Sequence, residues 1–279
     1  MAHKASHGQG YYEKQGVLVF RLAADFAQST LAGRKTLSRA CTIVCLKMAE
    51  SVHRSALSMM SIPVRQQAFR QARLKSSNAE AHQRPTSLCK RMITAYANAI
   101  LDANAIHEEA VEKQKRHDLN FNIPDAVRVC GGKFIEVDFC AVNELMSESL
   151  PRLLKMITKD VRLKSLPKLF LILVAYERAI LFVVDRKRGS IVLFDSHTHM
   201  VEQKVEGAYI AAASLTNMNV FCEWIVENIF PEASITTQEY ELSVLHFTER
   251  PTPGDCHTSL HIPVVSCRLF NEARKGCAA

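Results

Sequence analysis

Three apolar runs separated by short turns most restrict the fold of this chain. They cover Lys168 to Tyr176, Ala179 to Asp185 and Ile191 to His197. Runs of this length are typical of β-strands, and connections of a few residues join antiparallel neighbours because a parallel crossover needs a dozen or more. The sequence therefore predicts three strands in antiparallel succession.

Helical spacing dominates the first part of the chain. Ala40 to Leu57 places apolar residues at intervals of three and four, with Ser38 as a possible N-cap, and Thr86 to Lys115 repeats this spacing. Helices followed by a run of strands indicate an α+β fold rather than alternating βαβ units. We therefore expect an N-terminal helical lobe packed on an antiparallel sheet.

Weaker sequence patterns predict further strands and helices. Gln15 to Leu22 and Tyr240 to Phe247 are strand candidates, and Asn143 to Lys159 and Met218 to Phe230 are helix candidates. The two glycines Gly131-Gly132 lie between the short apolar runs Ala126 to Cys130 and Phe134 to Phe139, which suggests a β-hairpin.

Composition along the chain predicts one structured domain with polar ends. Residues 1–15 are expected to form a flexible N-terminus, residues 16–250 a single domain, and residues 251–279 a tail. The polar segment 63–84, rich in Gln, Arg and Ser, is expected to be an insertion or a mobile linker within that domain.

Cysteine usage predicts a reducing compartment. The chain has nine cysteines, an odd number, with no Cys-x-x-Cys pair and no stretch that resembles a signal peptide. Such usage is typical of reduced thiols in the cytoplasm or the nucleus rather than of a disulfide framework. If the chain is viral, the compartment would be that of the host cell.

The charge distribution bears on two classes of partner. The formal net charge is +7, and Pro151 to Arg188 holds ten Lys and Arg against three acids, but no nucleic-acid motif accompanies this segment, so we expect no nucleic-acid partner. The longest apolar run, Leu166 to Val184, is interrupted by polar and charged residues, so we also expect no membrane association.

The last of the three apolar runs ends in residues that can carry chemistry. Asp195, His197 and His199 alternate along the chain, so they would share one face if the strand continued through them. A carboxylate in this position can orient an imidazole that acts as a base. The same spacing also occurs among metal ligands, for which His246, Cys256, His257 and His261 could supply further donors, and a polar strand end is a third interpretation.

Cys41 is a candidate nucleophile. It lies where the first long helix is expected to begin, and the free N–H groups of a helix N-terminus favour a thiolate. Cys45 lies one turn deeper and is expected to be a core residue. Attack by a thiolate also needs donors for the developing oxyanion, and the backbone N–H of Cys41 and the side-chain amide of Gln28 in the preceding loop are candidates.

With these four residues placed, the chain resembles the deubiquitinating cysteine protease domain at the start of herpesvirus large tegument proteins and the tegument-like cysteine deubiquitinases. The resemblance rests on Gln28, on Cys41-Thr42, and above all on the string Leu193-Phe194-Asp195-Ser196-His197. It departs from the family at Ser38-Arg39-Ala40 before the cysteine and at Thr198-His199 after the histidine.

The resemblance implies a papain-like fold and a Cys41, His197, Asp195 triad assisted by Gln28. Such an enzyme hydrolyses the bond after the C-terminal glycine of ubiquitin or a ubiquitin-like modifier and needs no cofactor or metal. Its partners would be that modifier and its conjugates. Because the tail of ubiquitin is basic, acidic residues would be expected along the groove, and Glu136, Asp138 and Glu144 are candidates.

Two alternatives remain open from the residues alone. One is a metal-dependent hydrolase that uses Asp195, His197 and His199 as ligands. The other is a binding module that keeps the fold without catalysis. A separation between Cys41 and His197 well beyond hydrogen-bond reach would favour either alternative.

Overall fold

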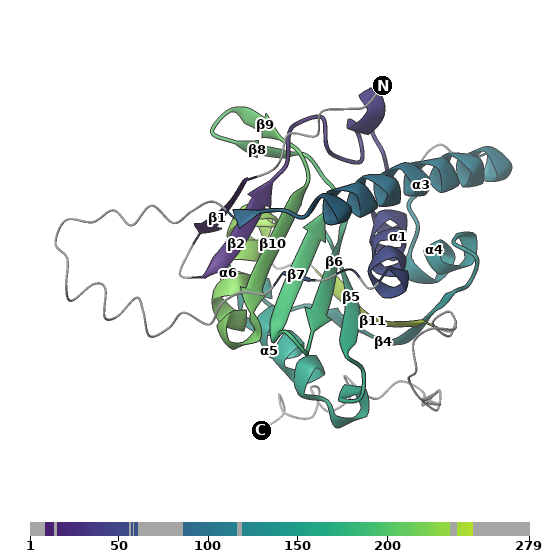
Figure 1. Cartoon of the computed structure of the whole chain (residues 1–279). Helices are drawn as coiled ribbons and strands as arrows, with labels where there is room; N and C mark the ends of the chain where they lie inside the picture. Colours follow the sequence, from purple (N-terminus) through teal and green to yellow (C-terminus); the bar gives the residue numbers. More distant parts are fainter. Residues whose placement is uncertain are drawn as a thin grey trace.

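A computed structural model of the chain describes residues 9–13, 16–55, 57, 59–60, 86–115, 119–234 and 239–247. Its centre is a nine-stranded sheet whose strands pair antiparallel in the order β3-β1-β2-β10-β7-β6-β5-β11-β4 (Figure 1). The strands are β1 (Gln9–Glu13), β2 (Val17–Arg21), β3 (Thr86–Ser87), β4 (Phe134–Val142), β5 (Lys168–Ala175), β6 (Arg178–Asp185), β7 (Ser190–Asp195), β10 (Tyr209–Ser214) and β11 (Tyr240–Phe247). A separate hairpin is formed by β8 (His199–Val201) and β9 (Lys204–Glu206).

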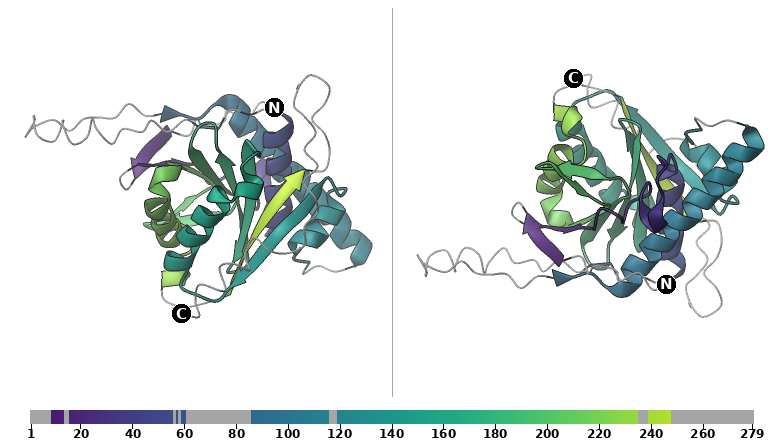
Figure 2. Two further views of the ribbon diagram at one scale, coloured as in Figure 1. Left: turned by 90° about the horizontal axis from the view of Figure 1, so that it is seen from below. Right: turned by 90° about the horizontal axis from the view of Figure 1, so that it is seen from above.

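Helices cover both faces of the sheet, which therefore lies between two layers (Figure 2). One layer consists of α1 (Cys41–Arg54), α3 (Lys90–Gln114) and α4 (Ile123–Val129), and the other of α5 (Met146–Lys159) and α6 (Met218–Asn228). Four 3-10 turns connect the elements: η1 (Leu31–Gly33), η2 (Val161–Leu163), η3 (Leu215–Asn217) and η4 (Pro231–Ser234). The expected α+β fold, with a helical lobe packed on an antiparallel sheet, is confirmed.

The central strands are buried on both faces because each faces a helical layer. In β6, Leu181 packs with the α1 and α3 side, while its neighbour Phe182 packs with the α5 and α6 side. The same alternation holds in β7 for Phe194 and Leu193. This two-sided burial explains why these strands read as continuous apolar runs, a pattern more usual in parallel sheets, although their pairing is antiparallel.

The first helix forms the contact between the two halves of the chain. Ten of its residues are buried, among them Ile43, Leu46 and Met48, and it packs across β6 and against α3. Its apolar face is wide because it faces the sheet and a neighbouring helix together. As a result, the N-terminus of α1 lies beside the central strands.

The sequence-based boundaries need three corrections. Residues 126–129 do not form a hairpin strand but belong to α4, with Cys130 as its C-cap, because the side chain of Asn122 accepts a hydrogen bond from Asp125 N and Pro124 suits a helix start. Within residues 1–15, Gln9–Glu13 forms β1, a strand that the sequence did not predict. The N-cap of α1 is Ala40 rather than Ser38, although the Ser38 hydroxyl accepts the Ala40 N–H at 3.2 Å.

The expected linker 63–84 and the expected tail 251–279 lie outside the described residues. Within the described part of the chain, no helix combines the length and the apolar character needed to cross a membrane.

Candidate active site

The fold brings together the cysteine and the histidine that the sequence singles out. Cys41 is the first residue of α1, and His197 follows the end of β7, the strand that pairs with β6 beneath the helix. The two side chains interact directly, since a hydrogen bond and the charge of His197 both act on the pKa of the Cys41 thiol. Although 156 positions separate them in sequence, they form one site.

The surroundings of Cys41 favour ionisation of its thiol. Burial opposes ionisation, but the hydrogen bond and charge of His197, together with backbone hydrogen bonds at Ala179 and Thr42, lower the pKa of Cys41 below its ordinary value. The residue is buried, with 9% of its surface exposed. Cys45 has no such partners, and burial raises its pKa well above the ordinary value, as expected for a core residue.

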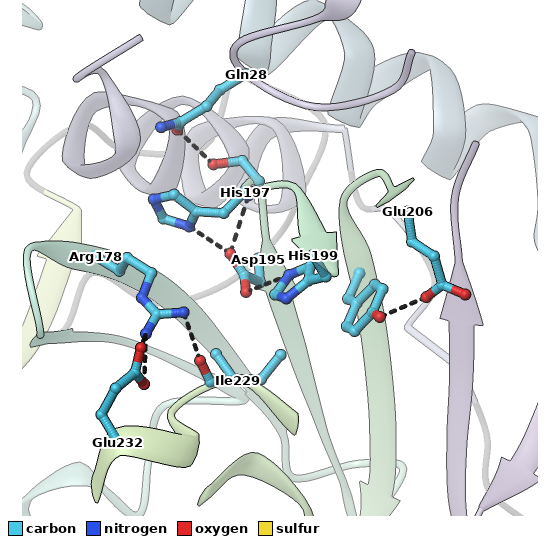
Figure 3. Close-up of polar contacts among 10 residues, drawn as sticks. Gln28, Arg178, Asp195, His197, His199, Glu206, Ile229 and Glu232 are labelled. Atoms are coloured by element: carbon cyan, nitrogen blue, oxygen red, sulfur yellow. Dashed lines mark hydrogen bonds and ion pairs between the residues drawn. The ribbon is translucent and has the colours of Figure 1, made fainter. Parts of the chain in front are cut away.

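His197 is held by Asp195 (Figure 3). The His197 Nδ1 lies 2.6 Å from Asp195 Oδ1, and the backbone N–H of His197 donates to the same oxygen at 3.1 Å. Burial opposes protonation, but Asp195 and the Cys41 thiol raise the pKa of His197 to about 10. Because Nδ1 faces the carboxylate, Nε2 is the ring nitrogen left for Cys41, as in the general triad arrangement.

Asp195 is fully buried and charged. Burial opposes ionisation, but the charge and hydrogen bond of His197, and then the polar contact with His199, hold the pKa of Asp195 well below its usual range. A buried carboxylate of this kind is stable only when its oxygens meet donors. The site is therefore a coupled unit in which the Asp195 carboxylate holds His197 and His197 lowers the pKa of the Cys41 thiol.

Strand alternation does not produce this geometry. The strand β7 ends at Asp195, and residues 196–198 lie outside regular structure before β8 begins at His199. The expectation that a strand continues to His197 is therefore wrong. Instead, the chain bends after Asp195, and the backbone N–H of His197 folds back onto the Asp195 carboxylate.

His199, the second imidazole after β7, is buried and has a partner of its own. Only 7% of the residue is exposed, its ring stacks on Tyr209, and its Nε2 lies 3.0 Å from Asp195 Oδ2. The bend after β7 turns this side chain inward, which the sequence pattern does not indicate.

Gln28 connects the two halves of the site. Its side chain is buried, Nε2 donates to the Ser38 carbonyl at 3.0 Å, and Oε1 accepts from the Ser196 hydroxyl at 2.8 Å (Figure 3). Its backbone N–H also donates to the Ser196 carbonyl. An amide nitrogen carries two hydrogens, so a second donor remains beside the one used for Ser38. Gln28 therefore joins the loop before Cys41 to the segment that carries His197.

Asn104 and Ser38 also support this loop, and Asn104 was not singled out from the sequence. Asn104 on α3 donates to the backbone carbonyl of Gln28 at 2.9 Å and accepts from the Ser38 hydroxyl at 2.6 Å. All three side chains are buried. A lone Asn in a helix gives no sequence signal for this role, because the contact depends on how α3 lies across the loop.

A glycine allows the loop to approach the sheet. A Cβ on Gly207 would overlap the carbonyl oxygen of Ala23 and lie 2.6 Å from that of Phe26. The backbone of this segment exchanges hydrogen bonds with Leu22 and Phe26. Only glycine permits this close packing, which holds the start of the loop that carries Gln28.

The histidines and Asp195 are not arranged as ligands around a common point. The two imidazoles each face a different oxygen of one carboxylate, so the carboxylate lies between them. In the part of the chain that the structure describes, no group of three or more His, Cys, Asp or Glu side chains could hold a metal ion. Cys256, His257 and His261 lie outside the described residues.

The acidic candidates for the groove lie near the sheet edge. Glu136 accepts a hydrogen bond from Ser243 on β11, and Glu144 pairs with Arg152 on α5. Glu136 and Asp138 belong to β4, which three strands separate from β7. Their described contacts therefore place none of the three beside Cys41.

The pKa shifts predict reactivity of Cys41 at low pH. We expect iodoacetamide to alkylate Cys41 already below pH 8.5, the ordinary pKa of a free thiol, because His197 stabilises the thiolate. In His197→Ala, burial remains without the imidazolium, so alkylation should become appreciable only above about pH 8.5. Mass spectrometry of the Cys41 peptide across a pH series measures both curves, and coincident curves would contradict the coupling.

Comparisons with known proteins give a remote likeness among solved structures. No family model matches the chain, and no curated protein matches it. Among solved structures, the chain is similar to the ubiquitin-specific protease encoded by murine cytomegalovirus tegument protein M48, in complex with a ubiquitin-based suicide substrate. The sequences are 17% identical, the match covers 85% of this chain and 89% of that chain, and the TM-score is 0.49. The assignment of chemistry therefore rests on the residues of this chain.

Proposed function

We propose that this protein is a cysteine protease that hydrolyses the bond after the C-terminal glycine of ubiquitin or a ubiquitin-like modifier. The observation that carries the proposal is the coupled unit in which Asp195 holds His197 and His197 lowers the pKa of Cys41. A thiolate paired with an oriented imidazolium is the arrangement that acyl transfer by cysteine requires. A reducing compartment, the cytoplasm or the nucleus, suits this nucleophile.

In the first half of the reaction, the Cys41 thiolate attacks the carbonyl carbon of the terminal glycine. The N–H groups at the start of α1 have no acceptor within the helix, so they can donate to the oxyanion, with Gln28 as a second source. His197 then gives its proton to the leaving amine as the C–N bond breaks. The product is a thioester between the glycine and Cys41.

In the second half, neutral His197 takes a proton from water, and the hydroxide attacks the thioester carbonyl. The C–S bond breaks, which restores the thiolate beside the imidazolium and releases the modifier as a carboxylic acid, whose proton passes to solvent to leave a free carboxylate. Asp195 stays ionised throughout, since its oxygens keep their donors and its pKa is far below neutrality.

The choice of substrate is supported by the sequence string that surrounds this site. Leu193 to His197, with Gln28 and Cys41 at their places before it, is the pattern shared with tegument-type deubiquitinases. In the fold these segments lie together, since Gln28 accepts a hydrogen bond from Ser196 within that string. The resemblance, rather than the charge of the protein, therefore points to ubiquitin.

A fluorogenic amide at the C-terminus of ubiquitin tests the proposal. We expect wild-type protein to release the fluorophore, and a matched substrate in which valine replaces the terminal glycine to resist hydrolysis because the acyl site must admit a residue without a side chain. Parallel substrates made from ubiquitin-like modifiers measure which modifier is preferred. Folded protein that hydrolyses none of these glycine substrates would overturn the proposal.

Replacement of Gln28 separates its two contributions. In Gln28→Ala we expect kcat to fall by about 10²- to 10³-fold through loss of an oxyanion donor. Ser196→Ala removes the bond to Gln28 Oε1 but leaves the amide nitrogen in place, so its kcat should fall much less. Steady-state kinetics on the ubiquitin amide make the comparison. Equal losses in both variants would mean that Gln28 acts only as a connection between the two segments.

A further inference from the structure

The two oxygens of Asp195 have different partners. Oδ1 accepts from both His197 Nδ1 and the His197 backbone N–H, whereas Oδ2 lies 3.0 Å from His199 Nε2. None of the carboxylate is exposed to solvent. Burial of a charge on this scale costs several kcal/mol unless both oxygens are paired, so the contact at Oδ2 matters to the whole site.

His199 and Asp195 Oδ2 depend on each other. The His199 N–H is not aimed closely enough at Oδ2 to count as an aligned hydrogen bond, yet neither atom has a hydrogen-bond partner elsewhere among the described residues. Each of these two buried atoms therefore has the other as its polar contact, at 3.0 Å. It closes the side of Asp195 opposite to His197 (Figure 3).

The ring of His199 is held in place by its neighbours. It stacks on Tyr209 with ring centres 3.9 Å apart and planes 15° apart. The Tyr209 hydroxyl donates to Glu206 at 2.5 Å, and Glu206 pairs with Arg21 on β2. The stack on Tyr209 of β10 therefore holds the ring that faces Asp195, while the Tyr209 hydroxyl points away toward Glu206 of β9.

We infer that His199 is a positioning residue for the proposed hydrolysis, where it fixes the plane of the Asp195 carboxylate so that Oδ1 stays on His197 Nδ1. This inference rests on the proposed function and assigns to His199 a role that acts through Asp195. His199 touches neither the thiol nor the scissile bond in this role. The proposed unit therefore contains a second imidazole, on the far side of the acid from the first.

The consequence of losing this contact follows from the groups that face His197. They are Asp195 on β7 and Cys41 on α1, and both raise the pKa of His197. A carboxylate free to rotate about its Cβ–Cγ bond would leave His197 less firmly held. The imidazolium would then lose its proton at lower pH, and the Cys41 thiolate would need higher pH to form.

Two variants of His199 test the inference. His199→Phe keeps a ring against Tyr209 but removes the N–H, whereas His199→Gln places an amide N–H at a similar reach from the backbone. We expect kcat on the ubiquitin amide to fall roughly 10- to 100-fold in the Phe variant, with KM changed less than about twofold, because orientation and not binding is lost. The alkaline limb of its pH profile should move to lower pH. In the Gln variant, kcat and the position of the alkaline limb should both be close to those of wild type.

Tyr209→Phe is the matched control, since it breaks the bond to Glu206 and keeps the stack on His199. Its rate should stay near that of wild type. The inference is overturned if His199→Phe keeps the wild-type kcat and the wild-type alkaline limb of the pH profile. It is also overturned if His199→Gln or Tyr209→Phe loses as much kcat as His199→Phe does. If His199→Phe does not fold, the Gln variant and Tyr209→Phe still decide between these outcomes.

Alkylation of Cys41 by iodoacetamide separates this inference from the proposed function. The reaction needs the thiolate and no ubiquitin, so it reads the His197 coupling even if the substrate assignment fails. We expect the alkylation curve of His199→Phe to move to higher pH relative to wild type, and that of His199→Gln to move little. An unchanged alkylation curve in His199→Phe would contradict the positioning role of His199. Absence of hydrolysis by wild-type protein would contradict only the assignment of ubiquitin as substrate.

Discussion

Replacing Cys41 by alanine is expected to abolish hydrolysis of the ubiquitin amide, with a loss of at least about 10⁴-fold in kcat, because the variant has no nucleophile to form the acyl intermediate. The residue begins α1, where its pKa is lowered by His197. Steady-state rates of release of the fluorophore measure the effect.

Cys45→Ala is the matched control for this change. Cys45 lies one turn later on the same helix, 3% exposed, and its thiol has a raised pKa. We expect the control to keep nearly the wild-type rate and to lose about 1 to 2 kcal/mol of unfolding free energy through the small cavity it leaves. Hydrolysis that survives Cys41→Ala but not Cys45→Ala would show that the nucleophile has been assigned to the wrong turn of the helix.

The second large effect is expected from Asp195→Asn, for which we expect kcat to fall by about 10³- to 10⁴-fold. The amide keeps the size of the carboxylate, but it removes the charge that raises the pKa of His197 and can donate to Nδ1 instead of accepting from it. His197 would then hold its proton on the wrong nitrogen. A pH profile of kcat should show a narrower plateau, with the alkaline limb at lower pH.

Asp185→Asn provides the comparison for Asp195→Asn. Asp185 is also a buried carboxylate at the end of a central strand, but β6 and β7 run in opposite directions, so it lies at the other end of the sheet and pairs with Arg188. Its variant should keep the catalytic rate. If both Asn variants lost activity equally, the effect would reflect disruption of the sheet rather than loss of the triad acid.

Much of the fold could be predicted from local patterns. The apolar runs at β5, β6 and β7, the spacing in α1 and α3, and the last strand β11 all mark elements at their observed places. These segments have strong periodicity or continuous apolar character because they pack on the core from one or both faces. The prediction failed where a short apolar segment could adopt either structure, at residues 123–129, and the cap at Asn122 decided in favour of a helix.

The sequence could predict which residues meet at the candidate site, but not the contacts that hold them there. Cys41 and His197 carry signals, a helix start and an acid two residues before the histidine, that reflect what catalysis needs. Their supporting contacts depend on tertiary packing: Asn104 reaches Gln28 from a different helix, and His199 turns inward only because the strand ends at Asp195. The backbone of Ala179, which contributes to the lowered pKa of Cys41, offers no residue type to recognise.

Covalent capture of Cys41 by a ubiquitin whose C-terminus carries an electrophile tests the central claim most directly. The probe needs the modifier to bind and the thiolate to be placed against its terminal position at the same time. We expect wild-type protein to gain the mass of one ubiquitin, with the adduct on the Cys41 peptide, and Cys41→Ala to gain none. Folded wild-type protein that stays unmodified, or an adduct on another cysteine, would contradict the account.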